Sequence, residues 1–307
     1  MARADAVVLI AFGGPERPED VRPFLDDVLR GRPVPRERYE EVVHHYELIG
    51  GRSPLNELTF RQADGLRAAL AARGTPLPVY VGMRNWSPYL ADVLARMADD
   101  GVRHALGLIL APHRTEASRE RYTAAVEAGR QALGARAPAI AYTGSWFDHP
   151  LFVETMAVRT RAALAALGEG APPHLVFTAH SIPTAMPDAE RYVREYQTTG
   201  RLVAAAVGDP PHTFAYQSRS GSPRDPWLEP DVCDVIRALA ARGVTRVALV
   251  PIGFVCDHVE VLYDLDVEAR QAAEASDVRL ARAETANDHP LFVRMLAEIV
   301  GAALGEP

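Results

Sequence analysis

The sequence predicts an α/β protein of two similar Rossmann-like lobes, each with a parallel sheet flanked by helices, and with a cleft between the lobes. Short apolar runs rich in β-branched residues alternate with longer amphipathic stretches, which is the order typical of parallel strands joined by helices. The stretch Asp-His-Pro-Leu-Phe-Val occurs twice, at 148–153 and at 288–293, an offset of 140 residues (288 − 148). A helix followed by glycine and a strand recurs at Gly101 and Gly243, an offset of 142 (243 − 101). These similar offsets indicate that the second half of the chain repeats the first.

The first strand is predicted at 6–12, because this run is apolar and Gly13-Gly14-Pro15 turns the chain after it. The turn does not match G-x-G-x-x-G, so it does not indicate a dinucleotide site. In the next helix Val21, Phe24 and Leu25 share one face. The elements predicted after the first strand are helices at 19–30, 36–46 and 58–73, a strand at 79–83, a helix at 88–100, a strand at 104–110, a helix at 116–133, a strand at 140–142 and a helix at 150–167.

The second half is predicted to repeat this order after a linker at 168–173. The predicted domains are therefore an N-terminal α/β lobe at 1–168 and a C-terminal α/β lobe at 173–307, with the last helix packing back on the first lobe. The elements predicted for the second half are strands at 174–178, 213–217, 244–250 and 278–281, and helices at 192–207, 229–242, from just after 257, and at 290–304.

Charge and composition exclude several functional classes. The net charge of -7 over 307 residues argues against general nucleic-acid binding. All 33 basic residues are Arg, and the chain has no Lys. It therefore cannot form a PLP Schiff base, act as a lysine aldolase or use a Walker A P-loop, because each of these needs an ammonium group.

The cysteines and the apolar runs predict the cellular setting. Cys233 and Cys256 form no C-x-x-C pair, which suits a reducing compartment and does not indicate a structural zinc or an iron–sulfur cluster. The first apolar run is too short for a signal peptide with a cleavage site, and no run approaches the length of a membrane span. We therefore expect a soluble cytoplasmic protein.

An acidic stretch follows the apolar run at 244–250. Gly253 permits a sharp turn, and Asp257 is placed to cap a helix that starts just after it. Glu260, Asp264 and Glu268 are four residues apart, so they are predicted to share one helix face past the carboxyl end of a parallel strand. The stretch is either a carboxylate track for a divalent metal or a solvated acidic face near a helix start, and spacing alone favours the second.

Polar residues follow the predicted strands. His180 ends the first strand of the second half, where its imidazole could accept a proton, bind a metal or simply pack. Phe12 holds the equivalent place in the first half; it is either a core residue or faces His180 across the cleft, an arrangement that suits a flat apolar ligand. Arg84 and Arg219 follow corresponding strands and could bind carboxylates or form ion pairs between loops.

Taken together, the motifs resemble those of ferrochelatases, which insert ferrous iron into a porphyrin in haem synthesis. The resemblance covers nearly the whole chain, and its most specific parts are the His180 motif and the acidic stretch. The motifs that carry it are Phe12-Gly13-Gly14-Pro15, Ile49-Gly50-Gly51-Arg52-Ser53-Pro54, Ala179-His180-Ser181-Ile182-Pro183, Gln217-Ser218-Arg219-Ser220-Gly221, Asp225-Pro226-Trp227-Leu228 and 251–268.

The resemblance implies roles for individual residues. It makes His180 and Glu260 the catalytic and metal-handling pair, with Asp264 and Glu268 continuing the line of metal-handling carboxylates. It implies a porphyrin site lined by Phe12, Arg30, His45, Tyr46, Ser53 and Tyr122.

Two positions depart from the family pattern. Many relatives that use coproporphyrin have Tyr in place of Phe12, and that Tyr can ligate the product iron, whereas Phe cannot. Some relatives have Arg in place of His45, so one propionate contact is expected to be weaker here. The chain also lacks the cysteine set of the family members that carry a cluster.

The resemblance thus implies a bacterial-type ferrochelatase, a lyase with porphyrin and ferrous iron as substrates. Coproporphyrin III is favoured over protoporphyrin IX because the form is short and bacterial. No tightly bound cofactor, iron–sulfur cluster, nucleic acid or transmembrane segment is expected, and transient partners from the haem pathway are compatible with it. The alternatives are a cobalt or nickel chelatase of another tetrapyrrole, and a two-lobed tetrapyrrole- or solute-binding protein without catalysis.

Overall fold

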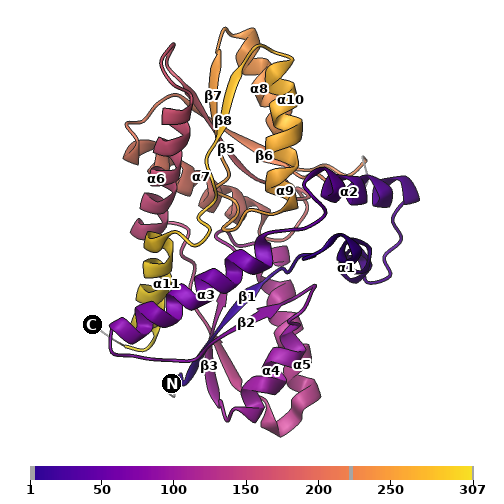
Figure 1. Ribbon diagram of the computed structural model, residues 1–307, viewed down its shortest axis with the longest axis vertical. Coiled ribbons are helices and arrows are strands. Elements are labelled where there is room, and N and C mark those ends of the chain that lie inside the picture. The colour runs from indigo at the N-terminus through magenta and orange to yellow at the C-terminus, as the bar shows by residue number, and fades with distance from the viewer. Residues whose placement is uncertain (1–3, 221–223, 306–307) are drawn as a thin grey trace. The chain divides into compact units, whose positions relative to one another are not determined.

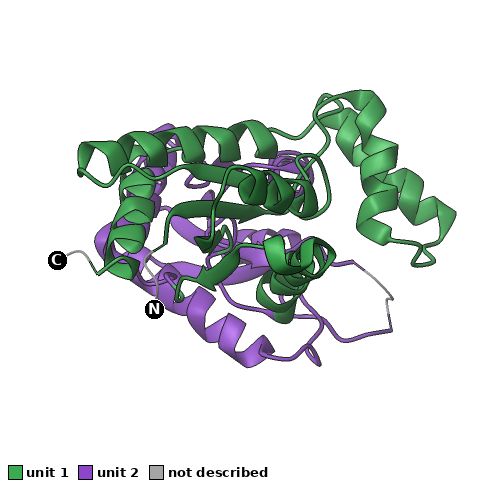
Figure 2. Ribbon diagram, turned by 90° about the horizontal axis from the view of Figure 1, so that it is seen from below, with its two compact units in different colours: residues 1–111, 116–145, 287–307 green, residues 112–115, 146–286 purple. Residues whose placement is uncertain are grey.

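The computed structural model describes residues 4–220 and 224–305. The chain packs into two compact units, which Figure 2 shows in different colours. Unit 1 comprises residues 1–111, 116–145 and 287–307, and unit 2 comprises residues 112–115 and 146–286.

Unit 1 contains a four-stranded parallel sheet in the order β2-β1-β3-β4. Figure 1 labels β1, β2 and β3 of this sheet. Its strands are β1 (Ala6–Ala11), β2 (Val79–Met83), β3 (His104–Ile109) and β4 (Ala139–Tyr142). Its helices are η1 (Pro18–Asp20), α1 (Val21–Leu29), α2 (Arg36–Leu48), α3 (Leu55–Ala72), α4 (Leu90–Asp99), the π-helical segment η2 (Glu116–Glu120), α5 (Arg121–Leu133), η3 (Gly134–Arg136) and α11 (Pro290–Ala303).

The two faces of this sheet are covered by different helices. Val8 and Ile10 of β1 pack in one apolar cluster with Leu94 of α4 and Val126 of α5. On β1 successive side chains point to opposite faces, so Val7 and Leu9 belong to the other face. The helix α3 packs on β1, β2 and α11. Burial of both faces explains why the strand is apolar throughout rather than alternating.

Unit 2 repeats this arrangement, with four parallel strands in the order β6-β5-β7-β8. Its strands are β5 (His174–His180), β6 (His212–Gln217), β7 (Arg246–Val250) and β8 (Arg279–Arg282). Its helices are α6 (Pro150–Ala166), α7 (Ala189–Ala206), α8 (Val232–Ala241), α9 (Val259–Leu262), the π-helical segment η4 (Asp264–Glu268) and α10 (Ala269–Glu274). The helices α8 and α10 share one apolar cluster with the sheet, and α6 and α7 pack on its strands as well.

The strand register confirms that the two units are repeats. Ala6 pairs with Ala105 in unit 1, and His174 pairs with Val247 in unit 2. Phe12 lies six residues after Ala6, and His180 lies six residues after His174. The two positions are therefore equivalent in the two sheets, as predicted.

The repeated Asp-His-Pro motif starts the helix that follows the last strand of each sheet. The side chains of His149 and His289 each accept a hydrogen bond from the backbone N–H two residues on, at 3.2 Å, with Pro at the first helical position. Packing, however, assigns α6 to unit 2 and α11 to unit 1. The division differs from the predicted boundary at 168–173 because α6 packs on α7, β7 and β8. The last helix, α11, packs on α3 of unit 1, as predicted.

Within residues 4–220 and 224–305, none of the helices combines the length and apolar character needed to cross a lipid bilayer.

Candidate active site

The site in unit 2 is built around His180 at the carboxyl end of β5. Its Nδ1 faces the carbonyl oxygen of Ser181, and the hydroxyl of Tyr192 donates to the His180 carbonyl at 2.9 Å. Its Nε2 therefore points away from the backbone and lies 3.5 Å from Oε1 of Glu260. The imidazole side chain is 29% exposed, so it is held in place yet open to a ligand.

Glu260 lies between two histidines. His180 approaches Oε1, and Nε2 of His258 approaches Oε2 at 3.2 Å. His258 is oriented by a contact of its Nδ1 with the Cys256 carbonyl at 3.0 Å and by the Phe254 ring, 4.5 Å away between centroids. His258 was not among the predicted site residues, although its position two residues before Glu260 could have identified it.

Electrostatics hold the pair in its ionised form. Burial opposes the charge on His180, but the Glu260 carboxylate and the Ser181 carbonyl outweigh it and raise the pKa of His180 to about 9. Burial likewise opposes ionisation of Glu260, and His180 and His258 together lower its pKa well below the usual range. Near neutral pH the imidazole is thus protonated, which differs from the neutral imidazole expected of a free general base.

The acidic stretch is not the regular helix that the spacing predicted. The helix α9 ends at Leu262, and Asp264–Glu268 form the π-helical segment η4. A π-helical turn has i→i+5 hydrogen bonds, so residues four apart no longer repeat as they do on an α-helix; here Glu268 N–H bonds to the Tyr263 carbonyl at 3.0 Å. The predicted single stripe is therefore wrong in its helix geometry.

The two carboxylates beyond Glu260 have different environments. Asp264 is buried and accepts a hydrogen bond from the Ser218 hydroxyl. Burial, and then the nearby Glu260 and Glu268, raise the pKa of Asp264 to about 7 against the effect of Ser218. Glu268 is exposed. The metal-handling role of Asp264 and Glu268 stays a prediction.

The predicted capping role of Asp257 is wrong. The residue before α9 is His258, and no side chain caps this helix. Asp257 instead accepts hydrogen bonds from the backbone and hydroxyl of Thr285, at 3.3 and 3.1 Å, and from Arg282 at 3.2 Å. Its carboxylate is therefore used to attach the loop to the segment after β8.

The end of β6 supports the same stretch from another side. Gln217 is buried and donates its side-chain N–H to the Glu260 carbonyl, and Ser218 bonds to Asp264. Arg219 pairs with Glu229 at 3.8 Å and with the Asp225 carbonyl, so of the two roles left open for it the structure favours the ion pair. Gly221, the last residue of this motif, lies outside the described residues.

In unit 1 the candidate porphyrin residues include an aromatic group after β1. Phe12 is 36% exposed, which excludes the core role considered for it. Its ring packs edge-on against Phe24 at 6.3 Å, and Phe24 contacts the rings of Tyr46 and Trp86 in the same way. An exposed ring backed by packed aromatic rings offers a flat apolar surface to a ligand.

Cationic groups lie beside these aromatic rings. Arg30 donates to the Arg84 carbonyl at 2.9 Å and to Oδ1 of Asn85 at 3.1 Å. The guanidinium of Arg84 lies over the Tyr122 ring, 5.9 Å from its centroid. Burial, and then Arg30, lower the pKa of Arg84, and no carboxylate pairs with it among the described residues. A half-buried cation without a carboxylate partner, such as Arg84, is suited to an anionic ligand, and Arg30 adds an exposed cation beside it.

The remaining two candidates are Ser53, which is buried, and His45, which is mostly buried. Ser53 packs against Gly14. A Cβ atom added to Gly14 would lie only 2.9 Å from the Cβ of Ser53, so the glycine permits this close approach. The side chain of His45 is 13% exposed, whereas that of His44 is 62% exposed. Burial, and next Arg38, lower the pKa of His45 to about 4, so it can offer a propionate a hydrogen bond but no charge near neutral pH.

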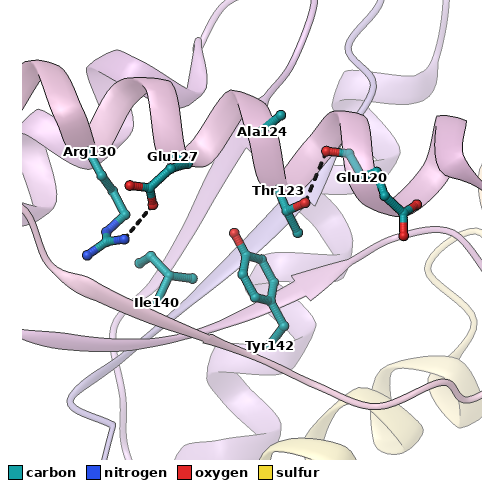
Figure 3. Close-up of a pocket in the computed structure, with 7 residues that line it drawn as sticks. All are labelled: Glu120, Thr123, Ala124, Glu127, Arg130, Ile140 and Tyr142. Carbon is teal, nitrogen blue, oxygen red and sulfur yellow. Dashed lines mark hydrogen bonds and ion pairs between the residues drawn. The ribbon is translucent and has the colours of Figure 1, made fainter.

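Neither a preformed metal site in the described residues nor the cavity between α5 and β4 adds to these candidates. Among the residues that the structure describes, no group of three His, Cys, Asp or Glu side chains is arranged to hold a metal ion. A cavity of about 320 Å³ lies between α5 and β4 (Figure 3), and no predicted site residue is among the seven that line it.

Known proteins resemble this chain over nearly its whole length. The family model described as Ferrochelatase matches residues 4–304. The Coproporphyrin III ferrochelatase of Mycolicibacterium vanbaalenii is 45% identical, over 96% of this chain and 89% of that protein. The protein of the same name from Mycobacterium avium is 46% identical, over 96% and 87%.

Two solved structures share the fold at low sequence identity. SirB from Bacillus subtilis with Fe3+ aligns with a TM-score of 0.58 and 11% identity, over 98% of this chain and 97% of that one. CbiX, described as the terminal enzyme for biosynthesis of siroheme in denitrifying bacteria, aligns with a TM-score of 0.55 and 14% identity, over 97% and 99%. These likenesses bear on the fold alone.

Proposed function

The chain belongs to the ferrochelatase family, and we propose that it is a coproporphyrin III ferrochelatase that inserts Fe(II) into this porphyrin in haem biosynthesis. The observation that carries the proposal is the identity of about 45% to coproporphyrin III ferrochelatases over nearly the whole chain. The cations of unit 1 support the choice of porphyrin, because coproporphyrin III has four propionates and protoporphyrin IX has two.

The chemistry requires a proton acceptor and a metal donor. A free-base porphyrin carries two pyrrole N–H protons, and inserting Fe(II) releases both as the four nitrogens become ligands. In our proposal the Glu260 carboxylate presents Fe(II), since an oxygen ligand can hold this ion without binding it too tightly to release it. His180, 3.5 Å from Glu260, takes the two protons one after the other and passes the first to solvent before it accepts the second.

The raised pKa of His180 links these two roles. The Glu260 carboxylate is what outweighs burial and keeps the imidazole protonated. When Fe(II) arrives at Glu260, its charge offsets that of the carboxylate, so the pKa of His180 falls and the imidazole releases its proton. His180 then becomes a neutral acceptor at the stage when the porphyrin must be deprotonated.

We propose that the enzyme works without a resident cofactor. Two cysteines are too few for the four thiolates that a common iron–sulfur cluster needs. Purified protein should therefore contain well under one equivalent of iron by elemental analysis. We also propose that it acts in the cytoplasm, and transient contacts with other haem-pathway enzymes are compatible with this setting.

The test is multiple turnover followed by absorbance. Free-base coproporphyrin III and Fe(II), in large excess over protein and without oxygen, should be converted fully to the iron porphyrin. A binding protein would stop at one equivalent. Parallel reactions with Co(II) or Ni(II) and with protoporphyrin IX test the alternatives, and a higher kcat/KM with either metal or with protoporphyrin IX would overturn the assignment.

Arg30 provides a second test of the porphyrin choice. Arg30→Ala removes a guanidinium that Asn85 and the Arg84 carbonyl hold in place. We expect a higher KM for coproporphyrin III with little change in KM for Fe(II). Unchanged KM values for both porphyrins would remove Arg30 from the propionate site.

A further inference from the structure

Arg282, at the carboxyl end of β8, connects both ends of the stretch that carries Glu260. Its Nε and Nη2 donate to the two oxygens of Asp266, each at 2.8 Å. Its Nη1 donates to Asp257 at 3.2 Å and to the Ala283 carbonyl at the same distance. One guanidinium thus joins the residue before His258 to a residue inside η4.

The environment of this contact favours a rigid connection. The side chains of Arg282, Asp257 and Asp266 are 11%, 13% and 28% exposed. A bidentate guanidinium–carboxylate pair fixes the relative orientation of both groups, and low exposure limits competition from water. Thr285 donates two further hydrogen bonds to Asp257. The start of the stretch is therefore attached to Arg282 at the end of β8 and to Thr285 just after it.

The stretch itself has little regular structure to fix its course. The helix α9 has four residues, η4 is a π-helical turn, and no side chain caps α9. Glu260 and His258 lie between the two carboxylates that Arg282 holds. Their spacing from His180 therefore depends on this contact as well as on their own backbone.

We propose that Arg282 is a positioning residue, which holds Asp257 and Asp266 so that Glu260 and His258 keep their positions relative to His180. The inference rests on the proposed function, because it concerns the groups assigned there to metal delivery and proton transfer. A planar group with several donors is required, since a Lys ammonium cannot span two carboxylates in fixed geometry.

The test compares Arg282→Lys with Arg282→Met, and uses Arg279→Lys and Arg279→Met as controls, since Arg279 is an exposed arginine of the same strand. Arg282→Lys keeps the positive charge beside the two carboxylates and is the variant expected to fold if Arg282→Met does not. We expect both Arg282 variants to lower kcat at least tenfold with KM for coproporphyrin III within twofold of wild type. Full rescue by Lys would mean that charge alone suffices, and would overturn the proposal.

Hydrogen exchange separates this inference from the proposed function. In Arg282→Lys the amides of residues 259–268 should exchange at least tenfold faster, while those of β5 and β7 are unchanged. This readout does not depend on turnover, so it stands even if the wild type proves inactive with coproporphyrin III. Unchanged exchange in 259–268, or acceleration spread over the whole of unit 2, would overturn the positioning role.

Discussion

At the scale of single residues, the arrangement of His180, Glu260 and His258 sets the chemistry. Glu260 lies between two imidazoles, at 3.5 and 3.2 Å, and the carboxylate and His180 stabilise each other's charged forms. Such a mutual shift couples the two groups, so they titrate together as a pair.

The first prediction concerns the pair of His180 and Glu260. His180→Ala and Glu260→Gln should each lower kcat about a hundredfold or more, because each removes a group to which the proposed mechanism assigns the metal or the protons. The double variant should be little worse than the poorer single variant, since residues that act together are non-additive. Steady-state turnover gives kcat, and quenching of porphyrin fluorescence shows whether the porphyrin still binds.

His174→Gln is a suitable control, because His174 lies in the same strand at its amino end and bonds to Thr213. The pH profile of His180→Ala should also lose the acidic limb that reports on the imidazole. Near-normal turnover of His180→Ala with that limb intact would remove His180 from the mechanism.

The second prediction concerns His113, a buried residue outside the candidate site. Its Nε2 lies 3.0 Å from the Thr199 hydroxyl, which donates to the Phe147 carbonyl, and burial lowers the pKa of His113 to about 3. The unfolded chain binds this proton near pH 6.5, so His113 contributes full stability above that pH and loses it as the pH falls towards 3. At pH 5 the loss should be about 2 kcal/mol.

Urea unfolding at pH 7.5 and pH 5.0 measures this loss. His113→Gln should show a smaller difference between the two pH values than wild type. Thr199→Val removes the hydroxyl partner and keeps the imidazole, so it should lower stability at both pH values and retain the wild-type difference. An equal pH dependence in His113→Gln and wild type would contradict the assignment.

At the scale of elements, the stretch after β7 combines a short helix with a π-helical turn, held by β6 and β8. Gln217 supports the Glu260 backbone, Ser218 bonds to Asp264, and Arg282 bonds to Asp266. π-Helical turns are rare, occur mostly as single turns within helices, and are frequent at functional sites. Here its position is set by side chains at the ends of the two edge strands, β6 and β8.

The third prediction concerns the carboxylates of this element. Asp264→Asn with Glu268→Gln should raise KM for Fe(II) severalfold and leave KM for coproporphyrin III nearly unchanged, if the two residues guide the metal. Relief of the repulsion from Glu260 and Glu268, which adds to burial in raising the pKa of Asp264, should also stabilise the fold slightly. Initial rates measured against each substrate separate the two KM values.

Glu274→Gln, which removes one charge at the end of α10, serves as the control for a general change in surface potential. Identical metal dependence in the double variant and wild type would return Asp264 and Glu268 to a structural role.

At the scale of the whole molecule, the units follow packing and not chain order. The helix α11 belongs to unit 1 although it ends the chain, and its Phe292, Met295 and Leu296 are fully buried. The Gln62 side chain of α3 donates to the Asn287 carbonyl at 2.8 Å, which fixes the approach to this helix.

The fourth prediction follows from this arrangement. A chain ending at residue 168 lacks α11, so the apolar face of α3 would lose its cover, and it should show no cooperative thermal transition by circular dichroism. In the full chain Phe292→Ala should lower the free energy of unfolding by about 3 to 5 kcal/mol. The exposed Arg294, changed to Ala, is the matched control on the same helix, and a cooperative melt of the 1–168 chain would contradict the prediction.

The sequence by itself determined the repeat, the parallel α/β class and the placing of His180 and Glu260 after strand ends. These features depend on local periodicity and on the offsets between motifs, which a chain carries before it folds. The family also followed from the motifs, and the match over residues 4–304 confirms it.

Only the tertiary structure decided which groups meet. The partners of Asp257 are 25 and 28 residues away in sequence, and those of Glu260 and Asp264 at the end of β6 are 43 and 46 away. Asp257 therefore looked like a helix cap, His258 was missed, and the acidic stretch looked like a regular helix. The packing of the last helix on the first lobe was predicted, but the place of α6 was not: the predicted boundary left it in the first lobe, whereas it belongs to unit 2. Packing energy depends on surfaces that the fold brings together, and the local pattern of α6 did not record which surface it would cover.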